Sequence, residues 1–231
     1  GMAVVQDGKL VIDCNNSHVN SLKQSVHFDE IMEINLNIPL PSKKANIIEI
    51  IPNSLITRHI VEEVNTCNQG FFLPDISADQ LKLAVIERHH MTKQIGLGIV
   101  KGVGLKYGAI ATTIAHDSHN LIIAGTNDAD MVLAANTIKE MQGGMIVIKD
   151  GQILASLELP IAGLISERPY REVYASLNNL HIALEELGAN NQFNPFLTLS
   201  FLALPVIPEL KLTDKGLFKV SKFEHIDIFS V

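Results

Sequence analysis

Two imidazoles, a carboxylate, a hydroxyl and an amide occupy five consecutive positions of this sequence. The residues are His116, Asp117, Ser118, His119 and Asn120. Three kinds of chemistry could use them: half of a metal site, proton transfer, or recognition of a substrate. The same residues are also typical of a polar turn whose side chains bond to nearby backbone, and their spacing reveals no third metal ligand.

A second group of ionisable side chains, Glu87-Arg88-His89-His90, follows another apolar run. A carboxylate beside an imidazole suits general acid–base catalysis if Glu87 and His89 converge in a cleft. Adjacent charged residues at this position are more often a solvated strand end. The sequence contains no His-x-His and no Cys-x-x-Cys motif.

Five glycines between residues 96 and 108 suggest a phosphate-binding loop. Neither Gly96-x-Gly98 nor Gly102-x-Gly104 is completed by a third glycine at the required spacing. We also predict no helix that starts there, as a phosphate loop would need. We therefore expect close backbone packing or a flexible flap in this segment.

The elements that must position these clusters are mostly strands. Apolar patterning predicts seven strands, at 47–51, 56–64, 81–87, 108–114, 120–125, 145–148 and 152–157. Helical spacing predicts two main helices, at 128–142 with Asn127 as its cap, and at 169–187. The proline-interrupted segment from Phe193 is expected to pack irregularly. The fold class is α+β (mixed α/β), with a mixed or antiparallel sheet.

Turn signals and polarity divide the chain into three parts. Asp7-Gly8 between apolar pairs predicts a β-hairpin within residues 1–14. Residues 15–27 are expected to be a linker, and residues 28–231 one globular domain.

Composition excludes several classes of partner. A net charge of −7 argues against nucleic acid and anionic membranes, and the absence of Trp leaves few platforms for base stacking. No apolar run approaches the ~20 residues needed to span a bilayer. The first residues lack the pattern of a signal peptide. Two cysteines fit a reducing compartment, so we expect a cytoplasmic protein.

Several ordered stretches of the chain resemble the C-terminal region of bacterial adenine deaminases, of the amidohydrolase superfamily. The stretches include Glu87-Arg88-His89, Gly96 to Gly102, Ala115 to Asn120, Gly125 to Asp128 and Leu199 to Leu210. The opening hairpin is similar to the last hairpin of the family's small β-domain, which follows a metal-binding barrel. The resemblance covers nearly the whole chain.

The resemblance implies the activity of the family, the hydrolysis of adenine to hypoxanthine and ammonia. The divalent metal, Mn or Fe, is expected in the barrel, which this chain cannot contain because a barrel takes ~250 residues. We therefore expect no cofactor in the chain itself and no activity from it alone. It would be an expressed fragment, a truncated gene product or one half of a split enzyme.

The resemblance also implies a place for the polar clusters. We expect His116, Asp117, Ser118, His119 and Asn120, together with Glu87 and His89, to face the metal site of the intact enzyme and its adenine. The expected partners are the missing barrel or another chain, with a homo-oligomer also open. Two alternatives remain: a standalone module that binds a purine or a partner without catalysis, and an inert remnant that self-associates through its former barrel interface.

Overall fold

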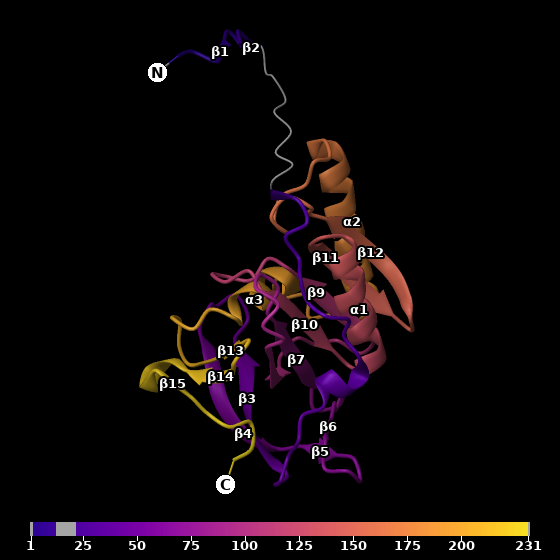
Figure 1. Cartoon of the computed structure of the whole chain (residues 1–231), viewed down its shortest axis with the longest axis vertical. Coiled ribbons are helices and arrows are strands. Elements are labelled where there is room, and N and C mark those ends of the chain that lie inside the picture. Colours follow the sequence, from indigo (N-terminus) through magenta and orange to yellow (C-terminus); the bar gives the residue numbers. More distant parts are fainter. Residues whose placement is uncertain (1, 13–21, 231) are drawn as a thin grey trace.

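The computed structural model describes residues 2–12 and 22–230, which form an α+β domain and a separate short hairpin (Figure 1). An eight-stranded sheet runs in the order β12-β11-β9-β10-β7-β8-β3-β4. Only β3 and β8 pair in parallel, through Ile48 and Val100, and the other neighbours are antiparallel. The sheet is therefore mixed, as the sequence predicts.

The strands of this sheet are β3 (Lys44–Ile50), β4 (Thr57–Glu63), β7 (Gln80–Ile86), β8 (Ile95–Lys101), β9 (Ala109–Thr112), β10 (Leu121–Gly125), β11 (Gly144–Lys149) and β12 (Gln152–Glu158). The helices are α1 (Asp128–Glu140), α2 (Tyr170–Glu186) and α3 (Pro195–Phe201), with short 3-10 helices at Glu33–Leu36 and Val220–Lys222. Short strands are β1 (Val5–Gln6), β2 (Lys9–Leu10), β5 (Asn65–Thr66), β6 (Phe72–Leu73), β13 (Leu210–Thr213), β14 (Gly216–Lys219) and β15 (Glu224–His225). All seven predicted strands and both predicted main helices are confirmed, and Asn127 caps α1 by accepting from the Asp130 N–H.

The eighth strand, β8, comes from the glycine-rich segment that the sequence did not predict as a strand. A side chain on Gly96 would collide with the carbonyl oxygen of Thr213, and one on Gly98 would press on Leu212 and Leu217. These glycines let the β13–β14 hairpin pack directly across β8. The expectation of close backbone packing is confirmed.

The glycine loop after β8 is also accounted for by an internal partner. The N–H groups of Gly102 and Gly104 donate to the two carboxylate oxygens of Asp79, at 2.9 and 3.0 Å. An anion bound to this loop would need such backbone donors. Asp79 already occupies them, which agrees with the rejection of a phosphate loop.

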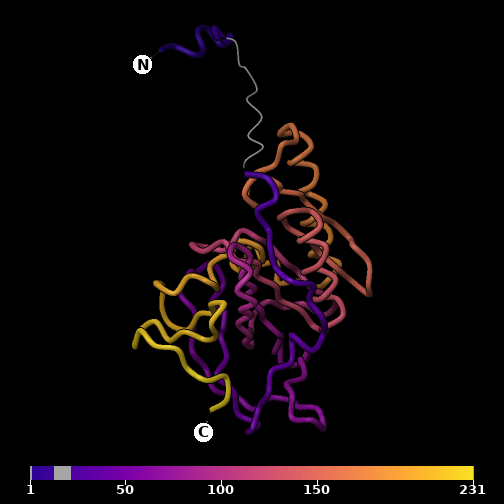
Figure 2. Tube along the Cα trace, in the orientation of Figure 1, coloured from indigo at the N-terminus to yellow at the C-terminus, as the bar shows by residue number. Residues whose placement is uncertain are grey.

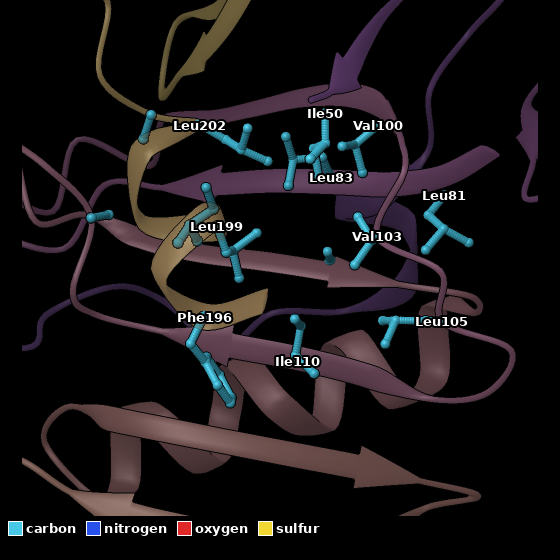
Figure 3. Packing of buried hydrophobic residues seen from close by; sticks show 14 of the residues in the cluster. Ile50, Leu81, Leu83, Val100, Val103, Leu105, Ile110, Phe196, Leu199 and Leu202 are labelled. Carbon is cyan, nitrogen blue, oxygen red and sulfur yellow. The ribbon is translucent and has the colours of Figure 1, made fainter. Parts of the chain in front are cut away.

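Both faces of the sheet are covered, so its central strands are buried throughout. Helix α1 and the segment 26–36 pack on one face, whereas α2, α3 and the β13–β14 hairpin pack on the other. Figure 3 shows Phe196 and Leu199 of α3, and Leu202 at its C-terminal cap, lying over the sheet near Leu83 and Ile110. Strand β7 is buried at every position, and its Lys82 pairs with Asp128.

The prediction of irregular packing after Phe193 is wrong for residues 195–201, which form α3, and for the strands β13, β14 and β15. The proline that suggested irregularity stands at the first helical turn, where its missing N–H costs nothing. Asn194 caps the helix by accepting from the Leu197 N–H. Pro205 and Pro208 do lie outside helices and strands.

The segment that precedes the sheet packs against α1. Val26, Phe28 and Ile31 are buried beside α1, and Asn136 exchanges two hydrogen bonds with the backbone of Ile31. Figure 2 traces this segment down the outside of the domain. Residues 15–21 of the predicted linker lie outside the described residues, and a domain boundary at 28 stays a prediction. No helix among the described residues is long and apolar enough to cross a membrane.

Candidate functional site

The two polar clusters lie together at one end of the sheet. Strand β7 ends at Ile86, which pairs with Leu121 at the start of β10, so the turns 87–94 and 113–120 are neighbours. Nε2 of His89 lies 2.8 Å from the carbonyl oxygen of Ser118. The structure therefore brings together all the residues that the sequence analysis singled out, although they come from two separate turns.

The turn 113–120 is fixed by its own backbone and by α3. The His119 N–H donates to the carbonyl oxygen of Ala115 at 2.5 Å, and the His116 N–H donates to that of Ser200 at 2.8 Å. The His116 ring lies 4.5 Å, centroid to centroid, from the ring of Phe201. The turn thus stands on a rigid support, as a positioned site requires.

The two imidazoles of this turn differ in how they are used. The Ala115 N–H donates to Nδ1 of His119 at 3.3 Å, which assigns the proton of the neutral ring to Nε2. Burial lowers the pKa of His119, and the nearby His116 and Arg88 lower it further. His119 is therefore a neutral donor through Nε2 near pH 7, whereas His116 is half-buried between Phe201 and the surface.

Glu87 lies in the neighbouring turn, and both of its carboxylate oxygens accept hydrogen bonds there. Its carboxylate accepts the backbone N–H groups of His89, His90 and Thr92 and the Thr92 hydroxyl, at 2.5 to 3.0 Å. Burial by itself raises the pKa of Glu87, but these donors outweigh it and lower the pKa to about 2. The geometry gives Glu87 a structural role, as the charged acceptor that shapes the turn.

Arg88 connects the site to two distant segments, and the sequence analysis did not single it out. Its side chain is 1% exposed, and its guanidinium donates to the carbonyl oxygens of Ser25, His119 and Ala162 at 2.5 to 3.0 Å. Burial lowers the pKa of Arg88 to about 10. The available signal was a basic residue two positions after the apolar end of a buried strand, because an arginine that is buried there must find acceptors inside the protein.

In the two polar clusters, the exposed residues are His89, His90, Asp117 and Ser118. Asn120 is buried, and its Oδ1 has no hydrogen-bond partner among the residues that the structure describes. Buried amide oxygens are nearly always bonded, so this atom is a candidate acceptor for a water or a ligand group. The exposed face of the site therefore offers a carboxylate, a hydroxyl and imidazoles.

A small cavity of about 200 Å³ opens beside His116, between α3 and the ends of β9 and β11. It is lined by Thr112, Ile114, His116, Met145, Asn194, Phe196, Leu197 and Ser200. The volume is below the ~300–1,000 Å³ of typical ligand pockets. This cavity can hold a side chain or part of a ligand.

The residues of this site do not fit a complete metal centre. Within residues 2–12 and 22–230, no group of three or more His, Cys, Asp or Glu side chains could hold a metal ion. The ring centroids of His116 and His119 are 5.5 Å apart, and Nδ1 of His119 already accepts from Ala115. The two imidazoles supply at most a partial ligand set.

The fold and the site together define an α+β domain that presents imidazole, carboxylate and hydroxyl groups at one end of its sheet. The sequence model of the adenine deaminase C-terminal domain matches residues 54–224. The chain belongs to this family.

Bacterial proteins named adenine deaminase match the chain along nearly its whole length. The protein of Geobacillus kaustophilus is 50% identical over 236 residues, which cover 100% of this chain and 40% of the relative. Those of Halalkalibacterium halodurans and Bacillus subtilis are 47% and 46% identical, and the matches cover 98% and 99% of this chain but 39% and 40% of the relatives. The chain therefore spans about 40% of the length of these relatives.

Proposed function

We propose that this chain is the accessory domain that covers the active site of a cytoplasmic adenine deaminase. In this reaction water adds to the purine carbon that bears the amino group, the carbon–nitrogen bond breaks, and hypoxanthine and ammonia leave. A divalent ion, Mn or Fe, in the barrel that this chain lacks would supply the activated water. The chain itself would bind and orient the base and exclude bulk water.

The observation that supports the proposal most strongly is that exposed polar side chains stand on a turn that is held in place by hydrogen bonds. Asp117 and Ser118 reach solvent from a turn that Arg88, Ala115 and Ser200 hold in place. A carboxylate accepts hydrogen bonds from an exocyclic amine, and a hydroxyl can serve a ring nitrogen in either sense. His119 would donate through Nε2 to a ring nitrogen, provided that the base reaches the half-buried ring.

Asp117 offers the sharpest test, because it is exposed and its loss should leave the fold intact. In the full-length enzyme, we expect Asp117→Ala to lower kcat/KM about 10- to 100-fold, the loss of one hydrogen bond to a charged acceptor. Asp227→Ala removes an exposed carboxylate from a different segment and should leave kcat/KM unchanged. Equal kcat/KM values for Asp117→Ala and the unaltered enzyme would contradict the proposal.

The chain alone provides a second test. An ultraviolet assay of adenine loss, with and without Mn²⁺ or Fe²⁺, should detect no turnover if the chemistry belongs to the missing barrel. Metal-dependent turnover that survives removal of contaminating host enzyme would contradict this assignment. Calorimetric titration with adenine separates the alternative of a standalone binding module, which requires binding by the isolated chain without turnover.

A further inference from the structure

Helix α2 extends past the end of the sheet that it packs on, and this overhang exposes an apolar surface (Figure 1). On one face of α2 and at its C-terminal cap, Leu180, Leu184 and Leu187 are buried in the core on this side of the sheet. Towards the start of the helix Val173 is still half-buried against the same core, whereas Leu177 at the edge of this face is 42% exposed. The helix surface beside the buried face, from its start to Leu177, is therefore open to a partner.

The overhang carries large aromatic and aliphatic side chains that are exposed to solvent. Tyr170 and Tyr174 are 76% and 66% exposed, and with Leu177 they follow the i, i+4, i+7 spacing of one helix face. Ile165, in the loop before α2, is 59% exposed. Tyrosines on an exposed face are typical of interfaces, because they combine apolar area with a hydrogen-bonding tip. We refer to Ile165, Tyr170, Tyr174 and Leu177 as the overhang surface.

The overhang surface lies at the same end of the sheet as the candidate site. Gly144 at the start of β11 pairs with Glu158 at the end of β12, and the loop to α2 follows directly. That loop is tied to the site end, since the Thr113 hydroxyl donates to the carbonyl oxygen of Gly163 and Arg88 donates to that of Ala162. A partner that covers the turn 113–120 can therefore reach the overhang surface as well.

The N-terminal segment enters the domain beside this surface. The Ala162 N–H donates to the carbonyl oxygen of Leu22 at 2.7 Å, and Lys23 forms a salt bridge with Glu167 at 2.8 Å. Leu22 and Lys23 therefore lie at this end of the domain, against the loop that contains Ile165. About 60% of the length of the Geobacillus kaustophilus relative lies outside the part that this chain covers.

The hairpin β1–β2 gives independent support for a partner. Met2, Val4, Val5, Leu10 and Val11 are all exposed, between 48% and 76%. A lone two-stranded hairpin is marginally stable in water, and this one has no apolar cover among the described residues. Its exposed side chains fit strands of a further module that this chain does not contain.

We propose that the overhang surface binds the remaining polypeptide of the full-length protein, and that this contact positions the turn 113–120 at the active site. The inference rests on the proposed function, because it takes the rest of the adenine deaminase as the partner. It commits the contact to the N-terminal half of α2 and the loop before it. The C-terminal half of α2, including the exposed Ile182, stays free of the partner.

Hydrogen exchange tests the docking without reference to activity. Amide exchange is compared between this chain alone and the full-length protein, peptide by peptide. We expect exchange over residues 165–177 to slow at least about tenfold in the full-length protein, the effect of about 1.4 kcal/mol of added local stability, whereas residues 181–186 exchange equally in both. Equal rates over residues 165–177 would overturn the inference.

Matched substitutions keep the test independent of folding. In the full-length protein, Tyr174→Glu should remove the slowed exchange over 165–177, whereas Ile182→Glu, on the same helix and 62% exposed, should not. Protection that is already present in the isolated chain, together with a dimer in analytical ultracentrifugation, would overturn the inference in favour of a second copy. If Asp117→Ala leaves kcat/KM unchanged while residues 165–177 remain protected, the proposed function fails but the docking surface stands.

Discussion

The turns 87–94 and 113–120 lie side by side at one end of the sheet, and both contain a carboxylate and two histidines. In the first turn the carboxylate is buried, because Glu87 accepts four donors from the residues that follow it. In the second turn Asp117 reaches solvent. Similar residue types therefore serve structure in one turn and remain available for recognition in the other.

The difference teaches where to look when a sequence shows two polar clusters. Glu87 directly follows the strand β7 and is itself followed by N–H groups that fold back onto it, which is the arrangement of a buried capping carboxylate. Asp117 lies inside its turn, and the turn is held by backbone bonds of Ala115 and His116 instead. Which groups hold the turn decides which groups are left for a ligand.

The largest expected effect in this comparison comes from the arginine that joins the two turns. Arg88→Met removes the donors to three carbonyl oxygens and should lower the free energy of unfolding by about 4 kcal/mol. Arg58→Met, at an exposed surface pair with Glu49, should change it by less than about 1 kcal/mol. Urea unfolding of both variants measures the difference, and similar losses would show that Arg88 does not hold the site together.

A smaller loss is expected in the first turn. Glu87→Gln keeps the shape of the side chain but replaces one acceptor oxygen by a donor that faces backbone N–H groups. We expect a loss of about 2 kcal/mol in urea unfolding, since at least one buried donor is left without a partner. A loss below about 0.5 kcal/mol would contradict the assignment of Glu87 as a structural carboxylate.

The same turn predicts a pH dependence with a definite sign. The pKa of Glu87 is lowered from 4.5 to about 2 in the folded protein, so the unfolded chain binds more protons between these values. Stability from Glu87 is fully present above about pH 4.5 and is lost as the pH falls towards 2. Chemical unfolding from pH 6 to 2 should show a shallower decline in Glu87→Gln than in the unaltered chain, and parallel curves would count against the prediction.

The smallest effect on stability belongs to the second turn. Asp117→Asn changes an exposed side chain and should alter the free energy of unfolding by less than about 0.5 kcal/mol. Together with the expected fall in kcat/KM for Asp117→Ala, this separates a functional carboxylate from the structural one at Glu87. A loss comparable to that of Glu87→Gln would remove the distinction between the turns.

The sequence predicted the fold where local pattern and packing agree. Seven strands of the large sheet and helices α1 and α2 follow from apolar spacing, and Asn127 was identified as a cap. Strand β8 could not be predicted from local pattern. Its glycines are required by the close packing of the β13–β14 hairpin across it, and this hairpin is distant in the sequence. Helix α3 was missed because a proline at a first turn resembles a proline that breaks structure.

The sequence indicated which residues make up the candidate site, but not which of their polar groups are taken up by internal hydrogen bonds. The sequence identified both clusters, and the structure places them together through the pairing of β7 with β10. It could not reveal that Glu87 is occupied or that Arg88 reaches Ser25 and Ala162, because these contacts join segments separated by more than sixty residues. Local pattern indicates which residues are polar, whereas tertiary contacts decide which of them remain available to bind a ligand.

The parallel pairing of β3 with β8 also has a consequence for how the domain folds. The β3–β4 hairpin can form locally, but the other edge of β3 pairs only with β8, which comes after the β5–β6 pair, β7 and the turns between them. Closing such a long loop costs chain entropy before the pairing returns any stability. We therefore expect refolding from urea in milliseconds to seconds, limited by the joining of β3 and β8 rather than by the helices.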